Sequence, residues 1–475
     1  MKDYDKSLSY RLRLIWAYKD VLRNHVGFIF RRYIKDFRKH QLAAAHRLLP
    51  KLQAAETEAE NLVRQQLGEI PCKVSNPISV AFFLTIPGMW KSDYLFKAMQ
   101  EDPRFHPYVV IFPYSVFKGF SKEEVRATLE RTRQFIADKG FEYIIPLKTP
   151  YSSSLSNDTA KQIDVTMPRN WQDVRETLHP DIVVFTTPYK DIPPQYFIYN
   201  FRDTLTCYVP YGFLSLKLYH INYDLIFHNI VGMHFIETSM HKRQAEKYSR
   251  NHGENTYLTG YAGTEVFVRK DYVPDDVWKP QPGKKRVIYA PHHSITGEPS
   301  FSTFLIFADD MVKLAHKYAD SIQFIFKPHQ LLKFKLERYW GKERTDTYYR
   351  QWQEMSNTQL EESSYVDLFL TSDAMIHDCG SFTSEYLFTR RPALYLIKTD
   401  KPDDNFCEFG VMSFEHHYHG SSVEDIERFL DNVVLKGIDP MKPQRQQFYE
   451  QYLAPIDNKM PSAQIINTIT RFIEQ

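Results

Sequence analysis

Hydrophobic and polar positions follow a repeating strand–helix pattern along most of the chain. Short apolar runs of strand length alternate with longer segments in which apolar residues recur at helical spacing. The clearest unit has a strand beginning at Arg286, a helix-like segment Phe304–Tyr318 and a strand beginning at Ile322. An earlier series repeats the pattern, with strands expected at Ile78–Ile86, Tyr108–Phe112, Tyr143–Pro146 and Ile182–Thr186 and helices expected from Asp93 and at Lys122–Lys139. The pattern predicts an α/β fold with two doubly wound, Rossmann-like parallel sheets.

Breaks in this pattern predict where the domains end. Pro71–Pro77 precedes the first strand, and Val268–Gly283, which contains three prolines and several charges, separates the two series as a linker does. Tyr151–Asn170, rich in Ser, Thr and Asn, is expected to be a loop. The predicted division is a helical basic extension over residues 1–70, a Rossmann-like domain over 71–267, a linker over 268–285, a second Rossmann-like domain over 286–445, and a helix over 446–475 that packs back across the interdomain junction.

The first residues of the chain are basic. Met1–Lys51 contains 13 Lys and Arg against 4 Asp and Glu, and its apolar residues keep helical spacing from Leu14 to Tyr33. Such a helix could lie on an anionic membrane surface. It could also form a helical hairpin with Lys51–Leu67 that packs on the body of the protein or on a second subunit, and we favour this second interpretation.

A glycine-containing loop follows the apolar run Val366–Leu370, which is expected to form a strand in the second half of the chain. Asp378, Cys379, Gly380 and Ser381 stand at the entrance of a predicted helix, where unpaired backbone N–H groups favour an anion. The chain has only 17 glycines in 475 residues, about half the usual share of roughly 7%, so a glycine here is informative. Gly380 would let the backbone approach a ligand, and Ser381 could cap the helix or donate to a phosphate oxygen. An ordinary capped strand–helix turn remains the alternative.

Two other predicted strands end in basic or imidazole side chains. The strand from Arg286 leads into His292, His293 and Ser294, and the strand from Ile322 leads into Lys327 and His329. The carboxyl ends of parallel strands meet at one edge of a sheet, where open α/β sheets bind ligands. The combined set suits a diphosphate. Each histidine taken alone could be a polar loop residue or could bond the backbone at a strand end, and the absence of an HExxH pattern makes metal binding a weaker interpretation.

These motifs together resemble a known family. The order Tyr289-Ala-Pro, Lys327-Pro-His, and then Ser372-Asp-x-x-Ile-x-Asp-x-Gly-Ser with Pro392-x-x-Tyr resembles the CDP-glycerol glycerophosphotransferases, which are the teichoic-acid polymerases and their capsule-building relatives. The resemblance implies the two-domain GT-B architecture, with an acceptor domain followed by a nucleotide-donor domain, and transfer without a metal or other cofactor. It also implies that His329, Asp378 and Ser381 contact the donor's phosphates, with Gly380 standing where the family usually has a serine. Glu385 could bind the nucleotide ribose or could complement the helix dipole.

The chain departs from the family at one motif. The family's Trp-His-Gly-Thr-Pro-Leu-Lys motif carries the proposed general base, and its nearest counterpart here is Val209–Lys217, which places Tyr211 at the histidine position. A tyrosine with a reference pKa near 10 is a poor base near neutral pH. His220, His228 or His293 could serve instead. The expected catalytic residues are His329, His293 and Tyr211, and the expected donor-binding residues are His292, Ser294, Lys327, Asp378, Gly380, Ser381 and Glu385.

Composition sets limits on the class of protein. A net charge of +2 gives no overall nucleic-acid signal, and the four cysteines Cys72, Cys207, Cys379 and Cys407 lack paired spacing and are expected to be reduced thiols. Cys379 stands where a helix entrance could lower its pKa, but with no base beside it we expect a structural role. No signal peptide and no apolar run of 18 residues is found, so the protein is expected in the cytoplasm or on the inner face of the cell membrane.

The sequence therefore predicts a transferase that moves glycerol phosphate, or a related polyol phosphate, from a CDP-linked donor to a hydroxyl of a cell-surface polymer or glycolipid. The expected partners are this donor, a polysaccharide, glycolipid or polyol-phosphate acceptor, a membrane surface reached through residues 1–50, and a second copy of the chain. The alternatives are a nucleotide-sugar-dependent glycosyltransferase of capsule or lipopolysaccharide synthesis, a sugar-nucleotide epimerase, and a non-catalytic assembly scaffold.

Overall fold

The computed structural model describes residues 74–114, 121–148, 164–189, 192–201, 203–296, 302–362, 365–398 and 405–474. The predicted basic extension over residues 1–70, the thiol of Cys72 and residues 151–163 of the predicted loop lie outside these ranges. Among the helices of the described ranges, none combines the length and the apolar character needed to cross a bilayer.

A sheet of seven parallel strands forms the first half of the molecule, in the order β3-β2-β1-β4-β5-β6-β7. The interior strand β1 is almost continuously apolar because helices and loops cover both faces of a parallel sheet. The strands are β1 (Ile78–Leu84), β2 (Phe105–Ile111), β3 (Tyr143–Ile144), β4 (Ile182–Phe185), β5 (Leu205–Tyr208), β6 (Met233–Ile236) and β7 (Thr256–Leu258). The α-helices are α2 (Asp93–Glu101), α3 (Lys122–Asp138), α5 (Val174–Thr177), α6 (Tyr219–Tyr223), α7 (Ile226–Ile230), α8 (Ser239–Tyr248) and α9 (Glu265–Val268), and short 3₁₀ turns include η3 (Pro87–Met89) and η7 (Ala262–Thr264).

The second half is built on a six-stranded parallel sheet in the order β10-β9-β8-β11-β12-β13. Its strands are β8 (Lys285–Ala290), β9 (Ile322–Phe326), β10 (Thr358–Leu360), β11 (Ala374–His377), β12 (Ala393–Leu396) and β13 (Tyr418–Gly420). Its α-helices are α10 (Phe304–Lys317), α11 (Leu332–Tyr339), α12 (Lys342–Glu354), α13 (Val366–Thr371), α14 (Phe382–Glu385), α15 (Glu408–Glu415), α16 (Val423–Arg428) and α17 (Lys442–Phe448), with π-helical turns at Phe429–Leu435 and Tyr449–Leu453. The prediction of two doubly wound, Rossmann-like sheets is confirmed.

One predicted element is wrong. The apolar run Val366–Leu370, taken as the strand before the glycine loop, forms helix α13, and the strand is the shorter segment Ala374–His377. Within α13 only Leu368 and Phe369 are fully buried, so the run is one helical face rather than a strand buried on both sides. A run of this length does not distinguish the two structures by periodicity.

Each sheet has one place where the direction of winding reverses. In the first sheet this switch point lies between β1 and β4, and in the second it lies between β8 and β11. Loops that leave the carboxyl ends of the strands at a switch point diverge and open a crevice for ligands. The loops after β8, β9 and β11, which carry the predicted site, leave three adjacent strands at and beside the switch point of the second sheet.

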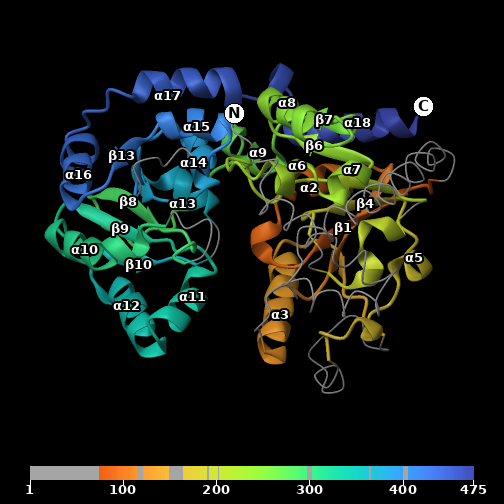
Figure 1. The fold of residues 1–475 in the computed structure, drawn as a ribbon, viewed down its shortest axis with the longest axis horizontal. Coiled ribbons are helices and arrows are strands. Elements are labelled where there is room, and N and C mark those ends of the chain that lie inside the picture. The colour runs from red at the N-terminus through yellow and green to blue at the C-terminus, as the bar shows by residue number, and fades with distance from the viewer. Residues whose placement is uncertain are drawn as a thin grey trace, which may run out of the picture.

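The two halves lie side by side, and the chain crosses between them twice (Figure 1). The chain passes from α9 to β8 and, after α17, returns to the first half as the C-terminal helix α18 (Pro461–Ile473). Three isoleucines of α18, at positions 465, 466 and 469, are buried in the first hydrophobic core. A further apolar cluster joins Phe213 and Tyr261 of the first half to Phe388 and Phe409 of the second. The two sheets therefore present their loops to each other across a shared core.

Candidate functional site

Three histidine rings meet at the switch point of the second sheet. The ring centroids of His292 and His293 are 4.2 Å apart, and that of His329 lies 4.9 Å from the first and 4.2 Å from the second. His292 and His293 come from the loop after β8, and His329 comes from the loop after β9. The backbone N–H of His329 donates to the Pro291 carbonyl at 3.1 Å. The structure thus brings His329 next to two histidines that precede it by 36 and 37 positions in the chain.

Hydrogen bonds fix which ring nitrogen carries the proton. The Leu331 N–H donates to His329 Nδ1 at 3.1 Å, and the Ser294 N–H donates to His292 Nδ1 at 3.2 Å. The Lys335 ammonium, which can only donate, lies 2.9 Å from His293 Nδ1. Each Nδ1 therefore accepts, and in the neutral ring each Nε2 bears the hydrogen. Burial lowers the pKa of all three rings, that of His293 to about 4, so the rings are neutral Nε2–H donors at pH 7.

This arrangement favours an anion over a metal ion. One ring nitrogen of each histidine lies within 4.8 Å of the others, which is close enough for a shared ligand. A metal would require the lone pair of Nε2, and each proton would then have to move to an Nδ1 that already faces a donor. The ammonium of Lys335 beside His293 opposes a cation further. An anion instead accepts the Nε2–H groups as they stand.

Lys327 adds a buried positive charge beside the histidines. Its side chain is only 8% exposed, and burial is the largest cause of its lowered pKa. Glu361 and Glu362 act on it electrostatically and raise the pKa by less than burial lowers it. An anion that binds near Lys327 would stabilise the charged form of this buried side chain.

Asp378, in the loop after β11, holds the segment between β8 and α10 in place by hydrogen bonds. It is 1% exposed, and one carboxylate oxygen accepts from the His292 N–H at 2.5 Å. The other accepts from the Thr303 N–H at 2.5 Å, from Thr303 Oγ1 at 2.9 Å and from Ser302 Oγ at 3.0 Å. Burial nevertheless raises the pKa of this carboxyl to about 6. The predicted contact of Asp378 with the donor stays a prediction, and the observed bonds give this residue a positioning role.

Replacement of Asp378 by alanine is expected to lower the free energy of unfolding by about 3 kcal/mol at pH 7, because donors at both ends of the segment between β8 and α10 lose their acceptor. Urea unfolding followed by fluorescence measures the change. The exposed Asp309→Ala serves as the matched control and is expected to change stability by less than about 0.5 kcal/mol. Equal stability of the two variants would contradict the positioning role.

The glycine loop packs tightly against the first half of the molecule. A Cβ atom on Gly380 would lie 3.3 Å from the side chain of Leu216, so a larger residue would press on the opposite loop. Ser381 makes no side-chain cap, and α14, which follows it, has only four residues. Cys379 donates from Sγ to the Ala290 carbonyl at 3.1 Å. Burial raises the pKa of this thiol, which corrects the expectation that a helix entrance would lower it and agrees with a structural role.

The loop that carries Tyr211 faces the same region from the first half. The Phe213 N–H donates to Glu385 Oε1 at 3.4 Å, and the hydroxyls of Ser215 and Ser384 lie 2.7 Å apart. Tyr211 itself is half-buried on the first core, with its ring 6.3 Å from that of Tyr189. The structure therefore places the counterpart of the family's base-bearing motif against α14, next to the glycine loop.

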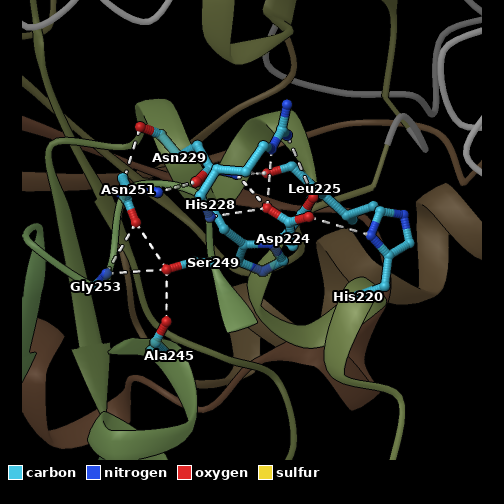
Figure 2. Close-up of polar contacts among 10 residues, drawn as sticks. His220, Asp224, Leu225, His228, Asn229, Ala245, Ser249, Asn251 and Gly253 are labelled. Atoms are coloured by element: carbon cyan, nitrogen blue, oxygen red, sulfur yellow. Dashed lines mark hydrogen bonds and ion pairs between the residues drawn. The ribbon is translucent and has the colours of Figure 1, made fainter. Parts of the chain in front are cut away.

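Two alternative bases lie in a polar network of the first half (Figure 2). His220 Nδ1 is 3.6 Å from Asp224 Oδ2, and Asp224 also accepts from Arg250 Nε at 3.0 Å and from Asn229 Nδ2 at 3.1 Å. His228 is 2% exposed, and its Nδ1 accepts from the Leu225 N–H at 3.3 Å. Burial lowers the pKa of His228 well below its usual value. These contacts serve the packing of α6 and α7 against the segment after α8.

Some residues of the site were missed by sequence reasoning. Glu385 is buried and accepts from the Tyr365 hydroxyl, which in turn accepts from Lys91 Nζ at 2.9 Å. The predicted contact of Glu385 with a ribose stays a prediction. Lys91 stands in the loop after β1, which the sequence places at the carboxyl edge of the first sheet but not in the donor site, whereas nothing in the sequence points to Tyr365 or to Lys335.

Residues 223–471, just over half of the chain, match the family model described as CDP-Glycerol:Poly(glycerophosphate) glycerophosphotransferase. The matched part contains the loops of all three histidines, Lys327, Asp378 and the glycine loop. No curated protein sequence matches the chain.

Several solved structures share the fold. A variant of the wall teichoic acid polymerase TagF superposes with a TM-score of 0.52 at 13% identity, covering 93% of this chain and 98% of that one. S. aureus MnaA with UDP gives 0.51 at 14% identity, covering 84% and 97%. A Listeria monocytogenes protein described as a UDP-N-acetylglucosamine 2-epimerase gives 0.51 at 16% identity, covering 84% and 97%. At these identities the likeness concerns the GT-B fold, which polymerases and epimerases share.

Proposed function

The chain belongs to the CDP-glycerol:poly(glycerophosphate) glycerophosphotransferase family, and from this premise we propose that it transfers glycerol phosphate from CDP-glycerol to a hydroxyl group of a cell-surface polymer or glycolipid. The single observation that supports the donor site best is the group of neutral Nε2–H histidines beside the buried Lys327 at the switch point of the second sheet. This group suits the two phosphates of a nucleoside-diphosphate donor.

The proposed reaction is one direct displacement. The acceptor hydroxyl oxygen attacks the β-phosphorus, the new O–P bond forms, and the bond from this phosphorus to the bridging oxygen breaks. CMP leaves with the bonding electron pair, and the proton of the hydroxyl passes to a base. His329, His293 and Lys327 stabilise the charge that grows on the leaving phosphate, by preorganised donors of the kind that supply much of phosphoryl-transfer catalysis. We propose that no metal or other cofactor is required.

The tautomer of His293 affects which residue can accept the proton of the acceptor hydroxyl. His293 carries its lone pair on Nδ1, which faces the Lys335 ammonium, so we assign this residue to charge stabilisation. Tyr211 remains the candidate at the motif position, on the loop that contacts α14. His292, Ser294, Gly380 and Ser381 are proposed to complete the donor site, and Glu385 its ribose side.

A nucleotide panel tests the proposed donor. CDP-glycerol, CDP-ribitol, CMP, CDP, UDP, GDP and common nucleotide sugars are added to the full chain, and the melting temperature is measured. A ligand that binds the folded state stabilises it by about 2.7 kcal/mol at one hundred times its Kd, so a cytidine-selective rise is expected. CMP release from CDP-glycerol with a polyol-phosphate acceptor is expected to persist in EDTA.

Other outcomes support other functions. A preference for uridine or guanosine nucleotides would favour a glycosyltransferase or an epimerase, whose fold this chain shares. No response to any nucleotide would favour a non-catalytic scaffold. The nature of the acceptor, a membrane contact through residues 1–50 and a second copy of the chain are proposals that rest on the sequence alone.

A further inference from the structure

Lys91 lies at the switch point of the first sheet. It follows β1 in the loop Pro87–Ser92, and β1 is the strand beside which the winding reverses. A Cβ atom on Gly88 of this loop would lie 2.9 Å from the side-chain amide of Gln330, the residue after His329. The loop therefore reaches across the junction and touches the histidine loop of the second sheet.

A polar chain holds the side chain of Lys91 in that position. Its ammonium donates to the Tyr365 hydroxyl at 2.9 Å and lies 4.7 Å from the centroid of that ring, and the hydroxyl donates to Glu385. Tyr365 and Glu385 belong to the second half, and Glu385 is one turn beyond the glycine loop. Lys91 is thus a residue of one sheet that is fixed by residues of the other.

Burial disfavours the charged form of the Lys91 side chain. Burial is the largest cause of its lowered pKa and outweighs the attraction of Glu385 and Asp93. Its charge also lowers the pKa of Lys327, so the two ammonium groups are close enough to repel each other. Lys91 and Lys327 therefore offer ammonium groups from the two halves of the molecule beside the imidazole donors, and an anion with several oxygens can accept from both.

We propose that Lys91 binds the β-phosphate of the donor from the first sheet, held in place by Tyr365 and Glu385, so that the two halves build the phosphate site together. The proposal rests on the proposed function in one respect, namely that the ligand is a nucleoside-diphosphate derivative. If Lys91 only joined the two halves, its replacement would lower the binding affinity of nucleoside diphosphates and monophosphates equally.

Isothermal titration of the full chain with CDP and CMP, and with UDP and UMP, tests this. Lys91→Met is expected to weaken the nucleoside diphosphates about tenfold to hundredfold and the monophosphates less than about threefold, because only the diphosphates carry a β-phosphate. Tyr365→Phe keeps the ring and removes the hydroxyl, and it is expected to weaken the diphosphates about threefold to tenfold. The exposed Lys97→Met on α2 is the matched control and leaves all four affinities unchanged.

The outcomes separate this proposal from the proposed function. The choice between cytidine and uridine nucleotides reports on the donor, whereas the diphosphate-to-monophosphate ratio reports on Lys91 with either base. Equal weakening of diphosphate and monophosphate in Lys91→Met, or no weakening, would overturn the proposal. Circular dichroism detects whether Lys91→Met unfolds. In that case the diphosphate-to-monophosphate affinity ratio is measured with Lys91→Gln and Tyr365→Phe instead. A ratio equal to that of the unmodified protein in these variants would also overturn the proposal.

Discussion

His329→Ala is expected to lower kcat/KM for CDP-glycerol about 100- to 1000-fold while changing the free energy of unfolding by less than about 1 kcal/mol. The imidazole presents its Nε2–H to the proposed phosphate position, and its Nδ1 bonds only a local backbone N–H in the same loop. Loss of the ring therefore removes a preorganised donor and leaves the sheet and its core intact. Initial rates of CMP release and urea unfolding measure the two quantities.

Two further variants make this result specific. His329→Gln retains a side-chain N–H donor near the Nε2 position and is expected to recover about tenfold of the lost activity. His316→Ala removes an exposed histidine of α10 and is the matched control. A variant His329→Ala that unfolds readily, yet binds nucleotides normally when folded, would show that the ring is structural and would remove it from the donor site.

Acid is expected to destabilise both halves of the protein, by on the order of 5 kcal/mol between pH 7 and pH 5. Four buried histidines are a cause of this effect, namely His228 and His234 in the first half and His377 and His417 in the second, each of them 2% exposed or less. Burial lowers the pKa of each, those of His234 and His417 to about 3. These rings are neutral when folded but bind protons on unfolding below pH 6.5.

The unfolded state therefore binds more protons, and stability is lost as the pH falls from 6.5 toward the lowered pKa values. Asp378 opposes this by about 1 kcal/mol, because its raised pKa makes the folded state take up a proton in the same range. Urea unfolding at pH 5, 6, 7 and 8 measures the net effect. His234→Phe removes one titrating ring beside Tyr208 and is expected to reduce the slope by about 1.4 kcal/mol per pH unit below pH 6. An unchanged slope in this variant would exclude His234 as a cause.

The sequence by itself determined the architecture and three of the loops that form the site. Apolar strands alternate with helical segments, and parallel strands bring their carboxyl ends to one edge. This physical rule is why the sequence alone groups His292, His329 and the glycine loop. It could not resolve Val366–Leu370, because a short apolar run fits a helical face as well as a strand.

Tertiary structure alone decided how these residues are used. Asp378 bonds Thr303, 75 positions away, and Lys91 bonds Tyr365, 274 positions away. The proton position on His293 likewise depends on Lys335, 42 positions away, which approaches the ring only in the folded chain. Sequence pattern records which face of an element is buried, but burial, hydrogen-bond partners and the resulting charge balance arise from contacts between elements, and local spacing carries no information about them.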